Sequence, residues 1–245
     1  MKTYGLIGFP LTHSFSQKYF TEKFQREGIT DCTYEIYPIQ SVNELNDLIK
    51  TNPKLLGLNV TIPYKQLILQ QLNSIKEIPS GLKACNCIKI KEGKTYGYNT
   101  DIIGFERSLL PQLKPYHTNA LILGNGGAAE AVKFVFDKLK ISYKIVSRKI
   151  HDGSALTYSD LNKSIIEENK LIVNTTPLGT FPNIDECPEI PYRFLTPEHL
   201  LYDLVYNPEK TLFLQKGEAL GASIKNGYEM LILQAEESWR IWNED

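Results

Sequence analysis

A chain of 245 residues that is 42% hydrophobic and 22% charged has the composition of an ordinary globular protein, long enough for one large domain or two smaller ones. Its 27 lysines and arginines balance 28 aspartates and glutamates, so no excess positive charge is available to bind a nucleic-acid backbone. No apolar run approaches the roughly 18 residues of a membrane span. The first ten residues are interrupted by glycines and Pro10, which makes a poor signal peptide. We therefore expect a cytoplasmic protein that binds neither nucleic acid nor membrane.

The cysteines show no zinc-ligand spacing and no neighbouring histidine cluster. They stand at Cys32, Cys85, Cys87 and Cys187. We expect reduced, buried thiols and no metal site. Cys85 and Cys87 fall on a strand-like segment, and we expect their side chains to point to opposite faces of the sheet.

The first hundred residues alternate strand-like and helix-like segments. Short apolar runs predict strands at 4–8, 34–38 and 55–61, and helical spacing of apolar residues predicts helices at 17–27, at 42–49 and from about residue 64. Residues 87–90 and 95–98, joined by Glu92-Gly93-Lys94, predict a hairpin.

A second unit is predicted after Asp101. It begins with a helix at 102–110 and a polar linker with two prolines at 111–118. Strands are predicted at 119–123, 143–146, 171–174 and 200–204, an irregular proline-rich loop at 177–197, and an amphipathic helix at 228–242. Strands that alternate with helices predict an α/β fold with mostly parallel sheets.

A glycine-rich segment follows the strand at 119–123 and opens a helix. It reads Gly124-Asn125-Gly126-Gly127-Ala128-Ala129, which is the G-x-G-x-x-G/A pattern of a dinucleotide-binding turn. The next strand ends at Ser147-Arg148-Lys149, where an NAD enzyme usually carries an acid for the ribose 2′-hydroxyl. A serine and two cations instead suit a 2′-phosphate, which predicts NADP.

Three polar clusters stand where strands of the first unit are predicted to end. They are His13-Ser14-Phe15-Ser16, the segment from Asn59 through Thr61 to Lys65, and Asn99-Thr100-Asp101 with Asn86 nearby in the chain. In an open α/β sheet, ligands bind beyond the carboxyl ends of the strands. Neutral donors together with one lysine and one aspartate suit a small hydroxylated substrate.

These motifs, in this order, resemble the shikimate dehydrogenase family along essentially the whole chain. The family's Ser-x-Ser motif, its Asn-Val-Thr-x-Pro segment leading to a lysine, and its Asn-Thr-Asp motif are similar to the three clusters above. Downstream, the resemblance continues through Asn174-Thr175-Thr176-Pro177-Leu178-Gly179, the Asp-x-x-Tyr-x-Pro-x-x-Thr pattern from Asp203 to Thr211, and the closing segment from Asn226 to Ala235. Departures are Gln17 for a proline, Tyr19-Phe20 for His-Asn, and Ser147 and Lys149 for the outer residues of an Asn-Arg-Thr phosphate motif.

The resemblance implies a two-domain enzyme of chorismate and aromatic amino-acid biosynthesis that reversibly reduces 3-dehydroshikimate to shikimate with NADPH. It implies substrate-binding residues at Ser14, Ser16, Asn59, Thr61, Lys65, Asn86, Asp101, Tyr206 and Gln234. It implies cofactor-binding residues at Gly124, Asn125, Gly126, Gly127, Ala128, Ser147, Arg148, Lys149, Asn174, Thr175, Thr176, Val205 and Gly227.

The expected domains are a substrate domain, 1–101 with 226–245, and a Rossmann-type NADP-binding domain, 102–225, with the last helix returning to the first domain. Lys65 and Asp101 are the expected catalytic pair, because reduction of a ketone leaves an alkoxide that must be protonated. Which of the two carries the proton stays open. Two alternatives remain: a quinate/shikimate dehydrogenase that uses NAD, and a non-catalytic relative that binds the same acid. We expect small-molecule partners and a monomer or homodimer.

Overall fold

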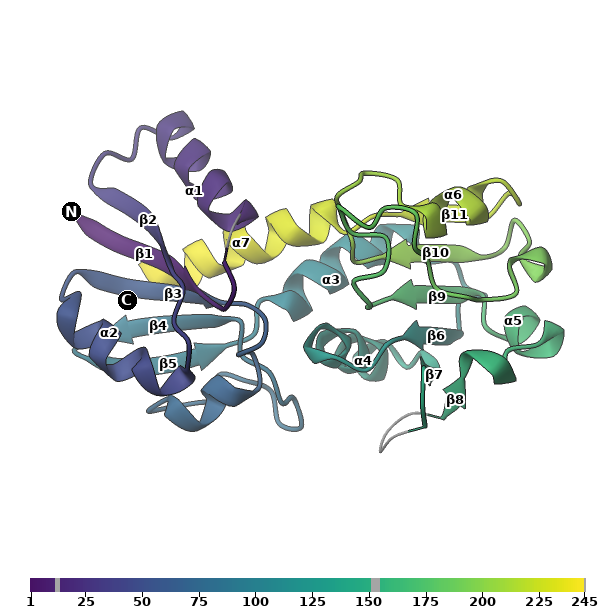
Figure 1. Cartoon of the computed structure of the whole chain (residues 1–245), viewed down its shortest axis with the longest axis horizontal. Coiled ribbons are helices and arrows are strands. Elements are labelled where there is room, and N and C mark those ends of the chain that lie inside the picture. The colour runs from purple at the N-terminus through teal and green to yellow at the C-terminus, as the bar shows by residue number, and fades with distance from the viewer. Residues whose placement is uncertain (12–13, 151–154, 245) are drawn as a thin grey trace. The chain divides into compact units, whose positions relative to one another are not determined.

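The computed structural model describes residues 1–11, 14–150 and 155–244 and divides into two compact units (Figure 1). Unit 1 comprises Met1–Thr100 with Ala235–Asp245, and unit 2 comprises Asp101–Gln234. The second boundary falls inside helix α7 (Tyr228–Asn243), whereas the sequence places it before residue 226. Of the predicted site residues, His13 lies outside the described ranges. No helix in those ranges is both long and apolar enough to cross a membrane.

Unit 1 is built on a mixed five-stranded sheet in the order β2-β1-β3-β4-β5. Strands β1, β2 and β3 are parallel, and β4 and β5 form the predicted antiparallel hairpin beside β3. The strands are β1 (Lys2–Ile7), β2 (Cys32–Tyr37), β3 (Leu55–Val60), β4 (Cys87–Lys91) and β5 (Lys94–Tyr98). The helices are α1 (Phe15–Arg26) and α2 (Leu45–Thr51), with 3-10 turns η1 (Val42–Glu44) and η2 (Leu67–Gln71).

An aromatic core joins the sheet of unit 1 to α1 and to the last turns of α7. Tyr4, Phe20, Tyr34 and Trp242 are buried in one cluster, in which the Phe20 and Tyr34 rings stack at 4.6 Å. Gly57 lets the helix approach β3, because a Cβ there would lie 2.4 Å from the Trp242 ring. This packing fixes α7 against the sheet within unit 1.

Unit 2 is built on a fully parallel six-stranded sheet in the order β11-β10-β9-β6-β7-β8. Read from β8, and counted from the first strand of the unit, this is the order 3-2-1-4-5-6 of a Rossmann sheet. The strands are β6 (Asn119–Leu123), β7 (Ser142–Ser147), β8 (Leu156–Thr157), β9 (Leu171–Asn174), β10 (Leu200–Asp203) and β11 (Ser223–Lys225). The helices are α3 (Asp101–Leu109), α4 (Gly127–Leu139), α5 (Lys163–Glu168) and α6 (Leu212–Glu218), with 3-10 turns η3 (Leu110–Gln112), η4 (Tyr158–Asp160) and η5 (Tyr192–Phe194).

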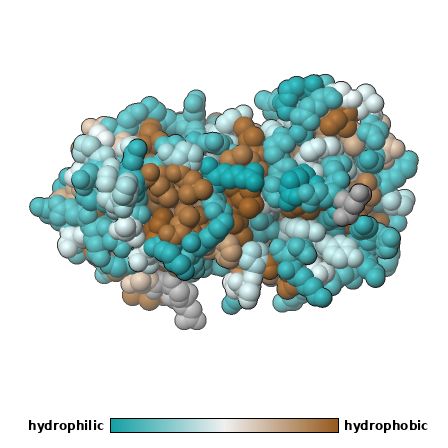
Figure 2. All heavy atoms as spheres, turned by 180° about the vertical axis from the view of Figure 1, so that it is seen from behind, coloured by the Kyte–Doolittle hydropathy of each residue, from teal (hydrophilic) through white to brown (hydrophobic). Residues whose placement is uncertain are grey.

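Helices cover both faces of the second sheet, as its buried strands require. On one face, Leu121 and Leu201 pack with Ile166 of α5 and Phe213 of α6. On the other, Phe105 of α3 packs edge-on against Tyr202 of β10 and against Phe136 of α4. Away from these cores, Figure 2 shows a face on which hydrophilic residues dominate and separate hydrophobic patches remain.

One local prediction is wrong. The helix expected from residue 64 is only the 3-10 turn η2, because the Lys65 carbonyl accepts the amide of Cys85 at 2.7 Å and the Leu69 amide donates to the Gln66 carbonyl. The polar stretch 111–118 lies between α3 and β6 within unit 2, where the sequence places it. Its His117 is buried, accepts the Lys114 amide at 3.0 Å and contacts the Glu198 carbonyl at 3.0 Å, so the polar residues close a turn.

The cysteine predictions need two corrections. No disulfide bond joins cysteines in the described residues, but only Cys85 and Cys87 are buried, whereas Cys32 and Cys187 are half-buried. The expectation of opposite faces fails because side chains two residues apart on a strand share a face, and because Cys85 precedes β4 instead of lying on it. Its Sγ contacts the Cys87 carbonyl at 3.3 Å.

Candidate active site

The predicted substrate segments of unit 1 meet at one edge of its sheet. Residue Asn59 near the end of β3 pairs with Cys87 at the start of β4, which pairs with Tyr98 at the end of β5. Because neighbouring strands run antiparallel here, the end of β3, the start of β4 and the end of β5 lie together. The end of β1 joins them, since Ile7 pairs with Val60. The register therefore brings four predicted segments to the same edge.

Amide and hydroxyl groups at this edge are buried and tightly paired. Asn86 donates from Nδ2 to Thr100 Oγ1 at 2.9 Å, and the Thr100 amide donates back to Asn86 Oδ1 at 2.6 Å. Both side chains are buried, whereas Thr61 and Lys65 are half-buried. Asp101 follows Thr100 directly, opens α3 and is 6% exposed. The edge thus carries neutral hydrogen-bonding groups and the Lys65 segment, and the chain passes from Thr100 directly to Asp101, the first residue of unit 2.

Asn59 differs from the other predicted substrate ligands at this edge, because its carboxamide is already occupied. Its Oδ1 accepts from the Tyr34 hydroxyl at 2.8 Å, and its Nδ2 donates to Ser238 Oγ at 3.0 Å and to the Asn86 carbonyl at 3.4 Å. The side chain is 5% exposed. Contact of Asn59 with substrate stays a prediction.

The predicted carboxylate ligands Ser14 and Ser16 lie at the start of α1. Ser14 is the N-cap, in extended conformation, and its Oγ accepts the Gln17 amide at 3.3 Å. Ser16 is in the first turn, and both serines are half-buried. The amino end of a helix carries partial positive charge and amide donors, which suits a carboxylate.

Two more predicted substrate ligands belong to unit 2. Tyr206 follows β10 and is 36% exposed, and partial burial raises the pKa of its hydroxyl. Gln234 lies on α7, is 7% exposed and donates from Nε2 to the Leu231 carbonyl at 2.8 Å.

The glycine turn stands at the switch point of the second sheet, between β6 and β9, where the strand order reverses. Gly124 has a φ of +101°, and a Cβ there would lie 2.9 Å from Thr175 Oγ1 and 2.8 Å from Thr176 Cγ2. Thr175 donates from Oγ1 to the Leu123 carbonyl at 2.8 Å. The structure therefore brings the glycine turn and the predicted residues after β9 into contact.

The turn has the features that a dinucleotide requires. A Cβ at Gly126 would meet nothing within 4 Å, so the backbone there faces open space. Gly126 caps α4 without a side-chain hydrogen bond, which leaves the helix amino end without a competing side chain at Gly127 and Ala128. Asn125 Oδ1 is buried and has no hydrogen-bond partner among the described residues. Such an orphaned acceptor fits a hydroxyl donor of a nucleotide sugar.

Asp203, at the end of β10, holds the loops on this side together, and the site prediction omitted it. Its carboxylate is fully buried and accepts from Asn174 Nδ2 at 2.9 Å, the Val205 amide at 3.0 Å and Thr211 Oγ1 at 2.5 Å. Asn174 in turn accepts the Thr176 amide at 3.0 Å. Burial raises the pKa of Asp203 to about 6, against the three hydrogen bonds, which lower it. The signal was present, because Asp203 and Thr211 are the ends of the Asp-x-x-Tyr-x-Pro-x-x-Thr pattern.

Gly227 and Val205 complete this side of unit 2. The Gly227 amide donates to the Val205 carbonyl at 3.2 Å, and a Cβ at Gly227 would lie 2.1 Å from the Leu204 carbonyl oxygen. Only glycine fits this approach.

The predicted phosphate residues lie at the end of β7. Ser147 is buried and donates from Oγ to the Lys149 carbonyl, whereas Arg148 and Lys149 are exposed. Two exposed cations beside the glycine-turn strand suit a phosphate.

The sheet of unit 2 has the Rossmann strand order and carries a glycine turn at its switch point. The sheet of unit 1 gathers neutral polar groups at one edge. Together these features define the class of dinucleotide-dependent α/β oxidoreductases.

Comparison with known proteins identifies the family within this class. The family described as the shikimate dehydrogenase substrate binding domain matches residues 6–88. The chain is 36% identical to the shikimate dehydrogenase (NADP(+)) of Clostridium beijerinckii over 100% of this chain and 93% of that protein. It is 32% identical to that of Desulforamulus reducens over 97% of this chain and 88% of that protein.

Solved structures agree. A shikimate dehydrogenase in complex with NADP+ superposes with a TM-score of 0.85 at 30% identity, covering 99% of this chain and 90% of that chain. The Thermus thermophilus enzyme in complex with NADP(H) and shikimate superposes with a TM-score of 0.85 at 26% identity, covering 99% of this chain and 93% of that chain. The chain belongs to the shikimate dehydrogenase family.

Proposed function

We propose that this protein is an NADP-dependent oxidoreductase that interconverts 3-dehydroshikimate and shikimate. The observation that carries the proposal is the meeting of Thr61, the Lys65 segment, Asn86 and Thr100 at one sheet edge in a member of this family. Such an edge offers neutral hydrogen bonds to ring hydroxyls and a lysine for proton transfer.

Substrate recognition divides between charge and hydroxyl contacts. We assign the substrate carboxylate to Ser14 and Ser16, because the amino end of α1 favours an anion, with Tyr206 as a further donor. We assign the ring hydroxyls to Thr61, Asn86 and Gln234, together with the catalytic pair.

The cofactor supplies the hydride. The residues of unit 2 fit NADP, since the glycine turn and the amino end of α4 would hold its phosphates, and Arg148 and Lys149 would neutralise a 2′-phosphate. The buried Asn125 Oδ1 would accept a hydrogen bond from a sugar hydroxyl.

Proton transfer is assigned to Lys65 and Asp101. When the substrate ketone is reduced, its oxygen gains negative charge, and an ammonium beside it stabilises that charge and donates a proton. The carboxylate of Asp101 orients the lysine and the neighbouring hydroxyl. In the oxidative direction the same groups remove the hydroxyl proton.

The test is a spectrophotometric assay of purified wild type with shikimate and quinate, each with NADP and NAD. Shikimate with NADP is expected to give the highest kcat/KM. A higher value for NAD with quinate would support the broader dehydrogenase instead, and binding without turnover would support the non-catalytic alternative.

Variants then locate the proton-transfer groups. Lys65→Ala and Asp101→Asn are each expected to lower kcat by about 10² to 10⁴. Lys76→Ala, an exposed lysine of the same unit, is the matched control and should keep wild-type kcat. A Lys65→Ala enzyme with the kcat of the control would remove that residue from the mechanism.

A further inference from the structure

A buried hydrogen-bond network in unit 1 contains two side chains that no motif marks, Tyr34 and Ser238. The carboxamide of Asn59 lies between them. The Tyr34 hydroxyl donates to Asn59 Oδ1 at 2.8 Å, and Asn59 Nδ2 donates to Ser238 Oγ at 3.0 Å. Tyr34 and Asn59 are each 5% exposed and Ser238 is fully buried, so neither Tyr34 nor Ser238 faces solvent at the sheet edge.

The network continues from Ser238 to a proposed substrate ligand. Ser238 Oγ lies 3.2 Å from Thr100 Oγ1, which accepts Asn86 Nδ2 at 2.9 Å. One chain of contacts thus joins Tyr34 of β2, Asn59 of β3, Ser238 of α7, and the residues that precede β4 and Asp101.

The direction of each hydrogen bond matters, because the two ends of a carboxamide differ. A hydroxyl donor on the Oδ1 side and a hydroxyl acceptor on the Nδ2 side hold Asn59 in a single orientation. With Nδ2 so placed, it also reaches the Asn86 carbonyl at 3.4 Å, which fixes the backbone that carries the Asn86 side chain. Loss of either hydroxyl leaves a buried polar group of Asn59 without its partner.

We infer that Tyr34 and Ser238 are positioning residues of the substrate site, which orient Asn59 and, through Thr100 and Asn86, the hydrogen-bonding groups that meet the substrate. The inference rests on the proposed function. It also gives Asn59 a framework role in place of a direct contact with substrate.

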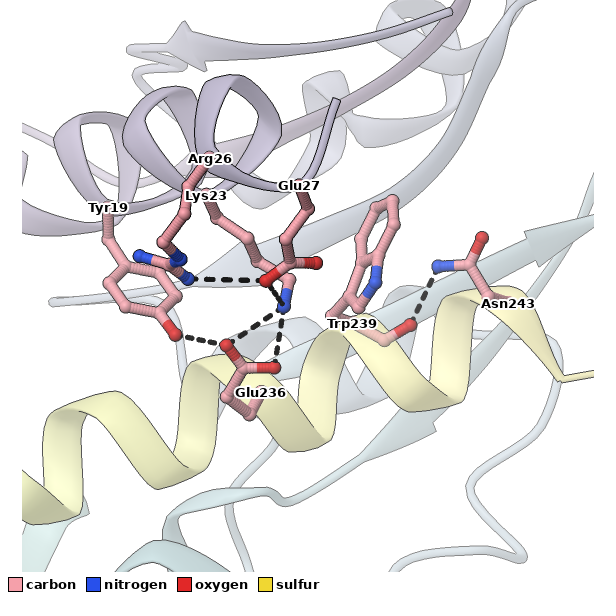
Figure 3. A network of polar contacts seen from close by, with 7 residues as sticks. All are labelled: Tyr19, Lys23, Arg26, Glu27, Glu236, Trp239 and Asn243. Atoms are coloured by element: carbon pink, nitrogen blue, oxygen red, sulfur yellow. Dashed lines mark hydrogen bonds and ion pairs between the residues drawn. The ribbon is translucent and has the colours of Figure 1, made fainter. Parts of the chain in front are cut away.

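A second group of contacts joins α1 to α7 within unit 1 (Figure 3). Lys23 of α1 is 4% exposed, and its Nζ lies 2.8 Å from Glu236 Oε2 and 2.9 Å from Glu27 Oε1. The Tyr19 hydroxyl donates to Glu236 as well. Glu236 precedes Ser238 by two residues on the same helix, so these contacts join the helix that carries Ser16 to the helix that carries Ser238.

The test compares two hydroxyl deletions in the network with two matched deletions elsewhere. Tyr34→Phe and Ser238→Ala remove the network hydroxyls. Tyr202→Phe and Ser108→Ala are the controls, because these two buried hydroxyls lie 2.7 Å apart in unit 2 and belong to none of the proposed site contacts. Every variant loses the same kind of buried hydrogen bond, so each is expected to lower Tm by about 2–4 °C.

Activity separates the two pairs. Tyr34→Phe and Ser238→Ala are expected to lower kcat/KM for shikimate about tenfold or more. Effects of this size follow the loss of a residue that orients a ligand-binding side chain. Most of the loss should appear in the KM for shikimate, with the KM for NADP within about twofold of wild type. Because both residues orient one carboxamide, the double variant should lose less than the product of the single losses.

The kinetic results distinguish failure of the inference from failure of the proposed function. If the network variants keep kcat/KM for shikimate within about twofold of the controls while wild type turns shikimate over, the inference is overturned and the proposed function stands. If wild type fails to turn shikimate over, both fall together. Should circular dichroism show that Tyr34→Phe is unfolded, the comparison of Ser238→Ala with Ser108→Ala decides the outcome.

Discussion

The buried carboxyl of Asp203 predicts a specific dependence of stability on pH. Its pKa is raised from 3.8 to about 6, mainly by burial. At about 1.36 kcal/mol per pKa unit, this shift corresponds to about 3 kcal/mol. The native state binds this proton more tightly than the unfolded chain does. The contribution is therefore fully present below about pH 4 and is lost as the pH rises through about 6.

The perturbation is Asp203→Asn, which keeps the shape of the side chain and cannot ionise. Hydrogen bonds that the variant loses to Asn174, Val205 and Thr211 lower its free energy of unfolding. The size of that loss does not depend on the titration of Asp203. The free energy of unfolding of wild type relative to the variant should fall by about 2 kcal/mol between pH 4.5 and 7.5. A further increase above pH 7.5 should change little.

The assay is urea unfolding at a series of pH values, followed by far-ultraviolet circular dichroism. Both tryptophans, Trp239 and Trp242, lie in unit 1, so their fluorescence reports separately on the unit that lacks Asp203. Asp160→Asn is the control, because hydrogen bonds from Thr157 lower the pKa of this exposed carboxyl and predict the opposite sign. A wild-type-to-variant difference that stays constant with pH, or grows with it, would refute the reasoning for Asp203.

Three further predictions test the site. Arg148→Ala should lower kcat/KM for NADP about tenfold or more and leave kcat/KM for NAD unchanged, because a charge-assisted hydrogen bond contributes about 1.5–3 kcal/mol. An unchanged ratio of the two kcat/KM values in steady-state assays would show that Arg148 does not bind the phosphate. Ser14→Ala and Ser16→Ala should each raise the KM for shikimate more than they lower kcat, and only Ser14→Ala should also lose about 1 kcal/mol of stability in urea unfolding, since Ser14 caps α1. Gly227→Ala should lose about 1–3 kcal/mol of stability in urea unfolding, because the added Cβ meets the Leu204 carbonyl. Gly126→Ala should keep its Tm, because a Cβ there meets open space, and should raise the KM for NADP.

Much of the fold followed from local sequence signals. Apolar runs ending in polar or glycine residues located most strands to within two residues, and the glycine turn lies at the switch point of a parallel sheet, as its pattern predicts. The missing helix after residue 64 has a non-local cause. At Lys65, the backbone carbonyl accepts the amide of Cys85, which is distant in the chain. Local propensity contains no information about such partners.

The same limit applies more strongly to the site. A motif identifies Asn59, but not what its carboxamide binds: one partner, Tyr34, is 25 residues away in the chain and the other, Ser238, is 179 residues away. Neither partner belongs to a recognisable pattern, because a buried hydroxyl on a strand or helix is an ordinary core residue until the fold supplies its neighbour. Asp203 shows the intermediate case, in which a motif names the residue and only the fold reveals that it joins Asn174, Val205 and Thr211. Residues that contact a ligand are therefore easier to predict from sequence than residues that orient those contacts. The structure adds most to the sequence where it identifies these orienting residues and predicts the effect of substituting them.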